Sequence, residues 1–401
     1  ARQRILKLSW RKSLAIEPAA GGAPPVLPIS DLEEDQRWMR LALSAARKAE
    51  GRTGANPPVG CAILDRAGQL VALAHTARDG RPHAETGALD MAGAAAQGGS
   101  VYVTLEPCAH IGKTGPCADA LIGAGVSRVV IAVRDPDPRV DGRGIDRLTA
   151  AGIAVTTGVE AEAASRVMAG FLYRTRHARP FVTLKTATSM DGRIALADGG
   201  KRWITGPQMR RFVHLQRSRC DAIMTGIGTV LADDPELTCR LDGVADDHPH
   251  RFILDSHLQT PLDSRLLKTV PQAGLTLFCG MEADSDRANT FRDAGATVQP
   301  VAADDHGRLG LDDVMAMIAA AGKGHLLVEA GGKLAASLLQ ADLVDRILWT
   351  QSTQVIGDDG IGAISTLGLT NLPDTSRFTV MDEGHFGADR FILMERPARS
   401  G

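Results

Sequence analysis

The sequence is poor in aromatic residues and carries almost no net charge. Phe, Trp and Tyr make up 4% of its 401 residues, with two Tyr and four Trp. Lys and Arg number 45 and Asp and Glu 47, which leaves a net charge of −2 at pH 7. Binding to nucleic acid depends on cationic side chains, and single strands are usually held on stacked aromatic rings. The composition therefore argues against nucleic acid as a partner.

Long apolar runs and dense cysteines are also missing. No stretch approaches the roughly 18 consecutive apolar residues of a membrane span, so we expect no membrane association. The six cysteines are too sparse in a chain of 401 residues to form a disulfide scaffold. We therefore expect a reducing, cytoplasmic location, where clustered cysteines more often bind metal or take part in catalysis.

The rest of the composition is that of a globular protein, with 44% hydrophobic and 23% charged residues. The length suggests two or three domains, and two is the simplest interpretation. The first 30 residues differ, because five basic residues precede the first acid, Glu17, and a segment rich in Ala, Gly and Pro follows. No apolar segment of a secretory signal is present there. We expect residues 1–30 to be a disordered or wrongly assigned extension, with a transit peptide as the alternative.

The pattern over residues 31–178 predicts an α/β domain. Apolar segments at 59–64 and 70–74 flank a turn and predict a hairpin. Further strands are expected at 101–105, 128–133 and 153–156, and helices at 83–96, 116–125 and about 145–150. This alternation favours a largely parallel sheet with helices on both faces.

A second α/β domain is expected over residues 179–398. The charged segment 174–180 ends in Pro180, and we place the domain boundary there. Strands are predicted at 181–186, 222–225, 251–254, 275–278, 325–329 and 346–350. Helical segments lie between most of them, which again is typical of an α/β fold.

One His, one Glu and two Cys in the first half have the chemistry of a catalytic zinc site. Such a site uses three protein ligands and keeps one position open, and His83, Cys108 and Cys117 can supply the three. Glu85, two residues from His83, can then move a proton from the attacking water to a leaving amine. A closed structural zinc with His110 as fourth ligand is the alternative, but it leaves Glu85 without a role.

The segment Leu-Glu-Pro-Cys-Ala-His-Ile-Gly-Lys-Thr-Gly-Pro-Cys at 105–117 resembles the bifunctional riboflavin-biosynthesis deaminase–reductase family. Eight residues separate its two cysteines, where the usual zinc-deaminase signature has two. Segments 56–60, 135–138 and 142–144 are similar to that family's substrate-binding segments, although Pro58 and Asp137 stand where many members have Asn. The resemblance implies a cytidine-deaminase-like three-layer domain followed by a dihydrofolate-reductase-like α/β domain. It also implies that Lys113 contacts a substrate phosphate.

The second half lacks the dinucleotide-binding fingerprint Gly-x-Gly-x-x-Gly, because Gly226-Ile227-Gly228 has no third glycine. Segments 185–193, 203–206, 229–235 and 329–332 instead resemble the reductase of the same family, which uses NADPH. The resemblance implies cofactor contacts from Ala187, Trp203, Thr229, Asp233, Gly331 and Gly332. It implies substrate contacts from Arg217, Leu237, Arg240 and Glu329. Lys185, Asp233 and Glu329 are the candidates for positioning nicotinamide and substrate and for catalysis.

The family resemblance implies a two-step enzyme with Zn²⁺ and NADPH as cofactors. The first step is hydrolytic deamination of 2,5-diamino-6-ribosylamino-4(3H)-pyrimidinone 5′-phosphate, and the second reduces the ribosyl chain to ribityl. One alternative is a zinc deaminase of another nucleobase or nucleoside with an accessory reductase-like domain. Another is a binding protein with a structural zinc, which an intact Glu85 argues against. The sequence leaves a homo-oligomer open.

Overall fold

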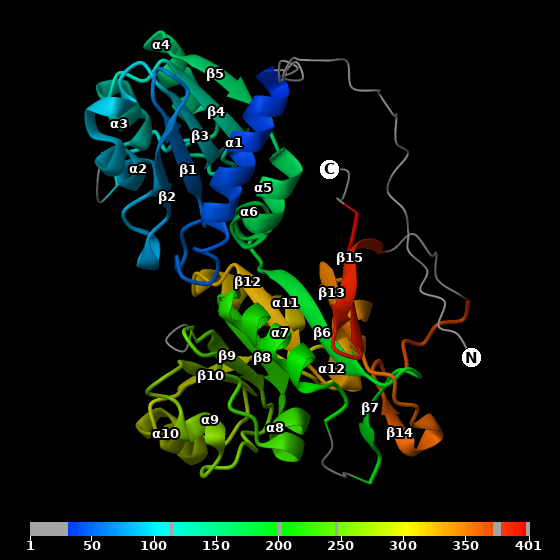
Figure 1. Ribbon diagram of the computed structural model, residues 1–401. Helices are drawn as coiled ribbons and strands as arrows, with labels where there is room; N and C mark the ends of the chain where they lie inside the picture. Colours follow the sequence, from blue (N-terminus) through cyan, green and yellow to red (C-terminus); the bar gives the residue numbers. More distant parts are fainter. Residues whose placement is uncertain (1–30, 113–114, 199–202, 245–247, 372–377, 398–401) are drawn as a thin grey trace, which may run out of the picture.

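The computed structural model describes residues 31–112, 115–198, 203–244, 248–371 and 378–397 (Figure 1). The extension expected at residues 1–30 and the predicted phosphate contact Lys113 lie outside these ranges. Within the described ranges, no helix combines the length and apolar character needed to cross a membrane.

The first sheet has five strands in the order β2-β1-β3-β4-β5. Their bounds are β1 (Gly60–Leu64), β2 (Leu70–His75), β3 (Ser100–Leu105), β4 (Arg128–Val133) and β5 (Ala154–Thr157). β1 is antiparallel to both β2 and β3, whereas β3, β4 and β5 run parallel. The prediction of a largely parallel sheet is confirmed in part, since β2, β3, β4 and β5 run in one direction and β1 runs against them. The hairpin expected from the sequence joins β1 to β2, and the long crossover through α2 returns the chain to β3 on the other side of β1, so β1 is antiparallel to both neighbours.

Helices cover both faces of this sheet and complete three layers (Figure 1). One face carries α1 (Asp31–Ala46) and α5 (Ala161–Val167), and the other carries α2 (Ala84–Ala92), α3 (Cys117–Gly123) and α4 (Arg143–Ala150). β1 is buried along its whole length, as expected for a strand covered on both faces. The helix expected over 83–96 ends at Ala92, because Gly93 adopts a positive φ of 52°, and a short 3₁₀ turn follows.

A short connection joins the two halves of the chain. It runs from α6 (Ala169–His177) into β6 (Phe181–Thr188), so much of the charged segment 174–180 is helical. Gly170 lies so close to Gly324 that an added Cβ would come within 2.8 Å of that backbone. The Tyr173 ring packs edge-on against Phe181 across the connection. The boundary between residues 178 and 179 falls in this connection and stays a prediction.

The second sheet has nine strands in the order β11-β10-β9-β8-β12-β6-β13-β16-β15. Besides β6, these are β8 (Ala222–Gly226), β9 (His250–Leu254), β10 (Leu275–Gly280), β11 (Thr297–Val301), β12 (His325–Glu329), β13 (Arg346–Gln351), β15 (Thr379–Phe386) and β16 (Asp389–Glu395). The strands from β11 to β13 are parallel, and the β15–β16 hairpin adds two antiparallel strands at one edge. All six strands predicted for this half are confirmed. A separate pair is formed by β7 (Arg193–Leu196) and β14 (Gly360–Gly362).

The helices of this domain include α7 (Pro207–Ser218), α8 (Ile227–Asp233), α9 (Arg265–Lys268), α10 (Ser285–Asp293), α11 (Leu311–Ala320) and α12 (Gly332–Gln340). The parallel strands β6, β8 and β12 are direct neighbours, so their carboxyl ends share one edge of the sheet. In open α/β sheets ligands bind outside that edge. Lys185 on β6 stands opposite Glu329 on β12 in the register, which places both at this edge.

Candidate active sites

Three potential zinc ligands converge in the first domain. His83 is the residue before α2, Cys108 follows β3, and Cys117 begins α3. The Nδ1 atom of His83 lies 3.2 Å from Cys117 Sγ and 3.7 Å from Cys108 Sγ. The backbone N–H of Cys117 donates to Cys108 Sγ at 3.3 Å. The structure thus brings together the three residues that the sequence singled out.

The donor set fits zinc in an open site. One imidazole and two thiols are ligands that zinc prefers, and their ligand atoms all lie within 4.8 Å of one another. Among the described residues this cluster contains these three and not His110, so the closed site with His110 as fourth ligand has no support in the geometry. Three protein ligands leave a coordination position for water or substrate.

The electrostatics of the cluster favour a thiolate and a carboxyl group that can exchange protons. Hydrogen bonds from Cys117 and His83 outweigh burial and lower the pKa of Cys108, while the hydrogen bond between the two cysteines and burial raise the pKa of Cys117. Glu85 lies in the first turn of α2 and is buried. Burial raises its pKa to about 7, and the charge of Cys108 acts in the same direction, although His83 opposes both. A carboxyl group with a pKa near the working pH suits proton transfer in both directions.

The two departures from the family pattern have different surroundings. The carboxylate of Asp137 accepts hydrogen bonds from the Arg139 side chain at 2.6–3.1 Å, and this contact lowers the pKa of Asp137. Pro58 follows Pro57, whose carbonyl accepts a hydrogen bond from the Thr76 hydroxyl at 3.0 Å. The negative charge of Asp137 is therefore paired with the guanidinium of Arg139.

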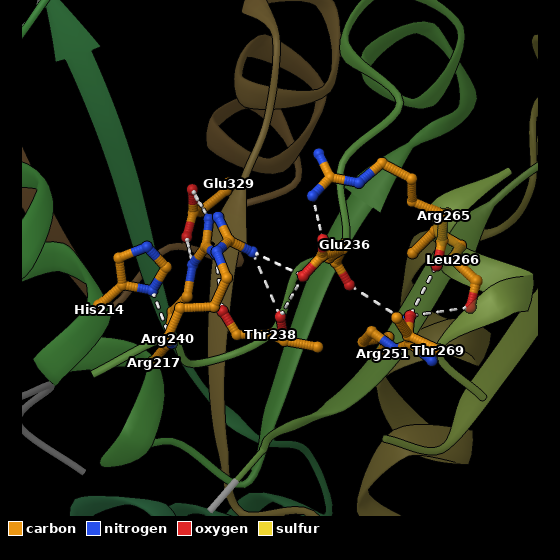
Figure 2. Close-up of polar contacts among 10 residues, drawn as sticks. All are labelled: His214, Arg217, Glu236, Thr238, Arg240, Arg251, Arg265, Leu266, Thr269 and Glu329. Atoms are coloured by element: carbon orange, nitrogen blue, oxygen red, sulfur yellow. Dashed lines mark hydrogen bonds and ion pairs between the residues drawn. The ribbon is translucent and has the colours of Figure 1, made fainter. Parts of the chain in front are cut away.

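In the second domain, Lys185, Arg217 and Glu329 form a buried ionic triad (Figure 2 shows the arginine pair). Arg217 Nε and Nη2 donate to the two carboxylate oxygens of Glu329 at 2.6 and 3.0 Å. Lys185 Nζ lies 3.6 Å from Glu329 Oε2. The pKa of Glu329 falls to about 2, because Arg217 and Lys185 outweigh the opposing effect of burial. Glu329 is therefore held ionised between two cations.

Arg217 is occupied in this arrangement. Besides Glu329, its guanidinium donates to the Thr238 carbonyl at 3.0 Å. Burial alone would lower the pKa of Arg217, but the Glu329 carboxylate outweighs it and raises that pKa. Its expected role as a phosphate clamp stays a prediction.

Arg240 lies beside the triad and contacts residues that the sequence analysis did not single out (Figure 2). Its Nη1 donates to Glu236 Oε2 and to the Thr238 hydroxyl, both at 3.2 Å. Its backbone N–H donates to His214 Nδ1 at 3.2 Å. Burial, with Arg217 and Arg240 nearby, lowers the pKa of His214 to about 4, so this ring is neutral. His214 precedes Arg217 by three residues on α7, and this spacing on one helix face was the available signal.

Three of the predicted cofactor residues, Gly331, Gly332 and Thr229, lie at or beside the start of α12. Gly331 caps this helix, and a Cβ there would lie 4.0 Å from the hydroxyl oxygen of Thr229 on α8. A Cβ on Gly332 would come within 2.5 Å of the Gly362 carbonyl, so this close approach requires glycine. Ala187 is two residues beyond Lys185 on β6 and shares its face.

The other predicted residues of this site differ in burial. Leu237 is buried with a left-handed φ of 54°, an uncommon conformation for leucine. Trp203 is 72% exposed, and the Arg210 guanidinium lies 4.5 Å from its ring centroid. Asp233 is the last residue of α8 and is also exposed. The contacts of these three residues with cofactor or substrate stay predictions.

Comparison with known proteins matches both halves of the chain. Residues 32–133 match the cytidine and deoxycytidylate deaminase zinc-binding region, and residues 180–386 match the RibD C-terminal domain. The riboflavin biosynthesis protein RibD of Escherichia coli is 40% identical over 369 residues, which cover 89% of this chain and 98% of the relative. The chain belongs to the RibD family. A RibD of Aquifex aeolicus is 34% identical and covers 91% of this chain and 99% of its own.

Solved RibD structures agree with this assignment. Acinetobacter baumannii RibD has a TM-score of 0.82 at 32% identity, covering 91% of this chain and 99% of its own. A Thermotoga maritima diaminohydroxyphosphoribosylaminopyrimidine deaminase/5-amino-6-(5-phosphoribosylamino)uracil reductase has a TM-score of 0.79 at 31% identity, covering 91% and 99%. The cytidine-deaminase-like and dihydrofolate-reductase-like domains expected from the sequence are confirmed. Like other RibD proteins, the chain is a bifunctional deaminase and reductase of riboflavin biosynthesis that uses zinc and NADPH.

Proposed function

We propose that the chain acts on 2,5-diamino-6-ribosylamino-4(3H)-pyrimidinone 5′-phosphate and yields 5-amino-6-ribitylaminouracil 5′-phosphate. The observation that carries the proposal is the open cluster of His83, Cys108 and Cys117 with Glu85 beside it. The substrate class is that of the Thermotoga maritima relative, a diaminohydroxyphosphoribosylaminopyrimidine deaminase and 5-amino-6-(5-phosphoribosylamino)uracil reductase.

In the deaminase domain, Glu85 is assigned the proton transfers. Zinc at such a site, when bound, makes water a nucleophile near neutral pH. Glu85 takes a proton from the attacking water and delivers it to the departing amine, so that water and the amine-bearing carbon yield a carbonyl group and ammonia. Its buried position in the first turn of α2, two residues after the ligand His83, suits both halves of this transfer.

In the reductase domain, the ionic triad orients the substrate and Lys185 is assigned the proton donation. NADPH, when bound, supplies the hydride. Reduction of the opened ribosyl chain also needs one proton. Glu329 cannot provide it because its pKa is about 2, and the Arg217 guanidinium does not lose protons in proteins. The Lys185 ammonium, 3.6 Å from Glu329, is the remaining donor of the triad.

The test measures ammonia release, NADPH oxidation and zinc content on one preparation. Glu85→Gln keeps the side-chain shape and removes the base. We expect deamination to fall about 10²–10⁴-fold with zinc content unchanged and NADPH oxidation of the deaminated substrate intact. Lys185→Met is the matched variant in the other domain. It should lose NADPH oxidation and keep deamination and zinc content. Loss of zinc in Glu85→Gln would make Glu85 a ligand and overturn its assigned role.

Three further expectations concern the whole chain. The six cysteines are free in the structure, which supports a reducing, cytoplasmic location. A deaminase unit over 31–178 and a reductase unit over 179–398 are proposed, and expression of the two fragments tests them. A homo-oligomer is the remaining expectation, and sedimentation of the full chain would test it.

A further inference from the structure

Glu106 is a buried acid beside the metal cluster that the deamination chemistry does not use. It follows β3 directly and precedes Pro107 and the ligand Cys108. The residue is 2% exposed. A buried carboxylate is costly unless its oxygens are hydrogen-bonded, so its partners indicate what it does.

All four hydrogen bonds of the Glu106 side chain come from backbone N–H groups of one segment. Its Oε2 accepts from Asp135 at 3.2 Å and from Gly142 at 3.0 Å. Its Oε1 accepts from Gly144 at 2.9 Å and from Ile145 at 3.2 Å. The last two donors belong to the first turn of α4, where unpaired N–H groups and the helix dipole favour an anion.

Residues 135–145, here called the 135–145 segment, connect β4 to α4 and contain the stretches that resemble the family's substrate-binding segments. The backbone turns sharply there, with φ of 20° at Asp141 and 90° at Gly142. Gly144 packs directly on the strand end that carries the ligand, since a Cβ there would lie 2.1 Å from the Pro107 carbonyl. The segment is therefore fixed to the chain two residues before Cys108.

We propose that Glu106 is a positioning residue of the deaminase, which holds the 135–145 segment in register with the metal ligand Cys108. The inference rests on the proposed deaminase function. A carboxylate suits this task because its two oxygens accept four bonds and donate none. A glutamine would keep one oxygen and turn an amide N–H₂ toward two backbone N–H groups.

The test compares Glu106→Gln with Glu162→Gln, a control acid on α5 whose side chain is 81% exposed. Zinc content, NADPH oxidation, and KM and kcat for ammonia release from the phosphoribosyl pyrimidine are measured on the full chain. We expect Glu106→Gln to keep zinc and NADPH oxidation while KM rises about tenfold or more, since hydrogen bonds to a charged group are lost. Glu162→Gln should match the wild type.

A KM within about twofold of wild type, with kcat falling in proportion to zinc content, would show a purely structural role and overturn the inference. A wild-type chain that releases no ammonia would instead refute the proposed function. Hydrogen exchange on the zinc-loaded wild type gives a second test that needs no variant. The amides of Gly142 and Gly144 should exchange at least about 100-fold more slowly than unprotected amides. Unprotected exchange at both would also overturn the inference.

Discussion

Removing the charge of Glu329 should destabilise the reductase domain by several kcal/mol. The substitution Glu329→Gln keeps the shape of the side chain but leaves Arg217 and Lys185 without their shared carboxylate. The side chains of Arg217 and Lys185 are only 11% and 13% exposed, so water cannot replace the lost partner. Breaking a buried pair by removing one partner costs about 3–5 kcal/mol.

The pKa of Glu329 gives an independent magnitude for the same interaction. Lowering it from 4.5 to about 2 on folding corresponds to about 3 kcal/mol. Because the pKa is lower in the folded chain, the ionised carboxylate stabilises the fold above about pH 4.5. This stabilisation disappears as the pH falls toward 2. The stability difference between wild type and Glu329→Gln should therefore be full at pH 7 and shrink below pH 4.5.

Urea unfolding at a series of pH values, followed by a probe in the second domain, measures this difference. Glu383→Gln is the control, because Glu383 pairs with Arg390 on the exposed β15–β16 hairpin and both side chains are 44% or more exposed. Such a surface pair contributes less than about 1 kcal/mol. A Glu329→Gln chain that is as stable as the control at pH 7 would refute the reasoning about the buried triad.

The remaining predictions concern metal and pH. Cys108→Ser should lose most of its zinc, while Cys220→Ser, in the other domain, should keep it; metal analysis showing the reverse would disprove the ligand set. Burial raises the pKa of Glu50 to about 7, although Arg219 and other arginines oppose it, so its ionisation destabilises the folded chain as the pH rises from 4.5 past 7. The stability of Glu50→Gln relative to wild type should therefore increase between pH 5 and pH 8, to an advantage of up to about 3 kcal/mol. Thermal unfolding at the two pH values measures this difference, and a variant no more stable than wild type at either pH would contradict the prediction.

Local patterns were sufficient for much of the fold. β4 and β12 have the predicted bounds because each has a continuous apolar run at its centre, residues 129–133 in β4 and 326–328 in β12. Strand direction was not predictable in the same way, since it depends on how long each crossover is and on which side of β1 it returns. The β15–β16 hairpin was not predicted. Every position of β15 is exposed or only partly buried, and its sequence shows no apolar run.

The two candidate sites differ in the same way, since the residues of one are recognisable from the sequence and the contacts of the other depend on the fold. His83, Glu85, Cys108 and Cys117 are recognisable from the sequence because zinc chemistry needs those residue types. The contact between Arg217 and Glu329 joins residues 112 positions apart, and no local pattern indicates it. Spacing places Glu329 at a strand end, but only the fold reveals that two cations hold it ionised.

Glu106 and Arg251 show why buried charges outside the chemistry escape sequence analysis. Arg251 is fully buried, and its guanidinium donates to the Glu236 carbonyl at 3.0 Å and to the Thr269 hydroxyl at 2.6 Å (Figure 2). Glu236 in turn contacts Arg240, so a buried cation holds the loop of a predicted substrate residue by its carbonyl group. Glu106 holds the 135–145 segment by N–H groups. In each domain the sign of the buried charge suits its backbone partners, because a cation donates to carbonyl groups and a carboxylate accepts from N–H groups. The sequence does not show which backbone groups these are, because only folding brings them to the charged side chain.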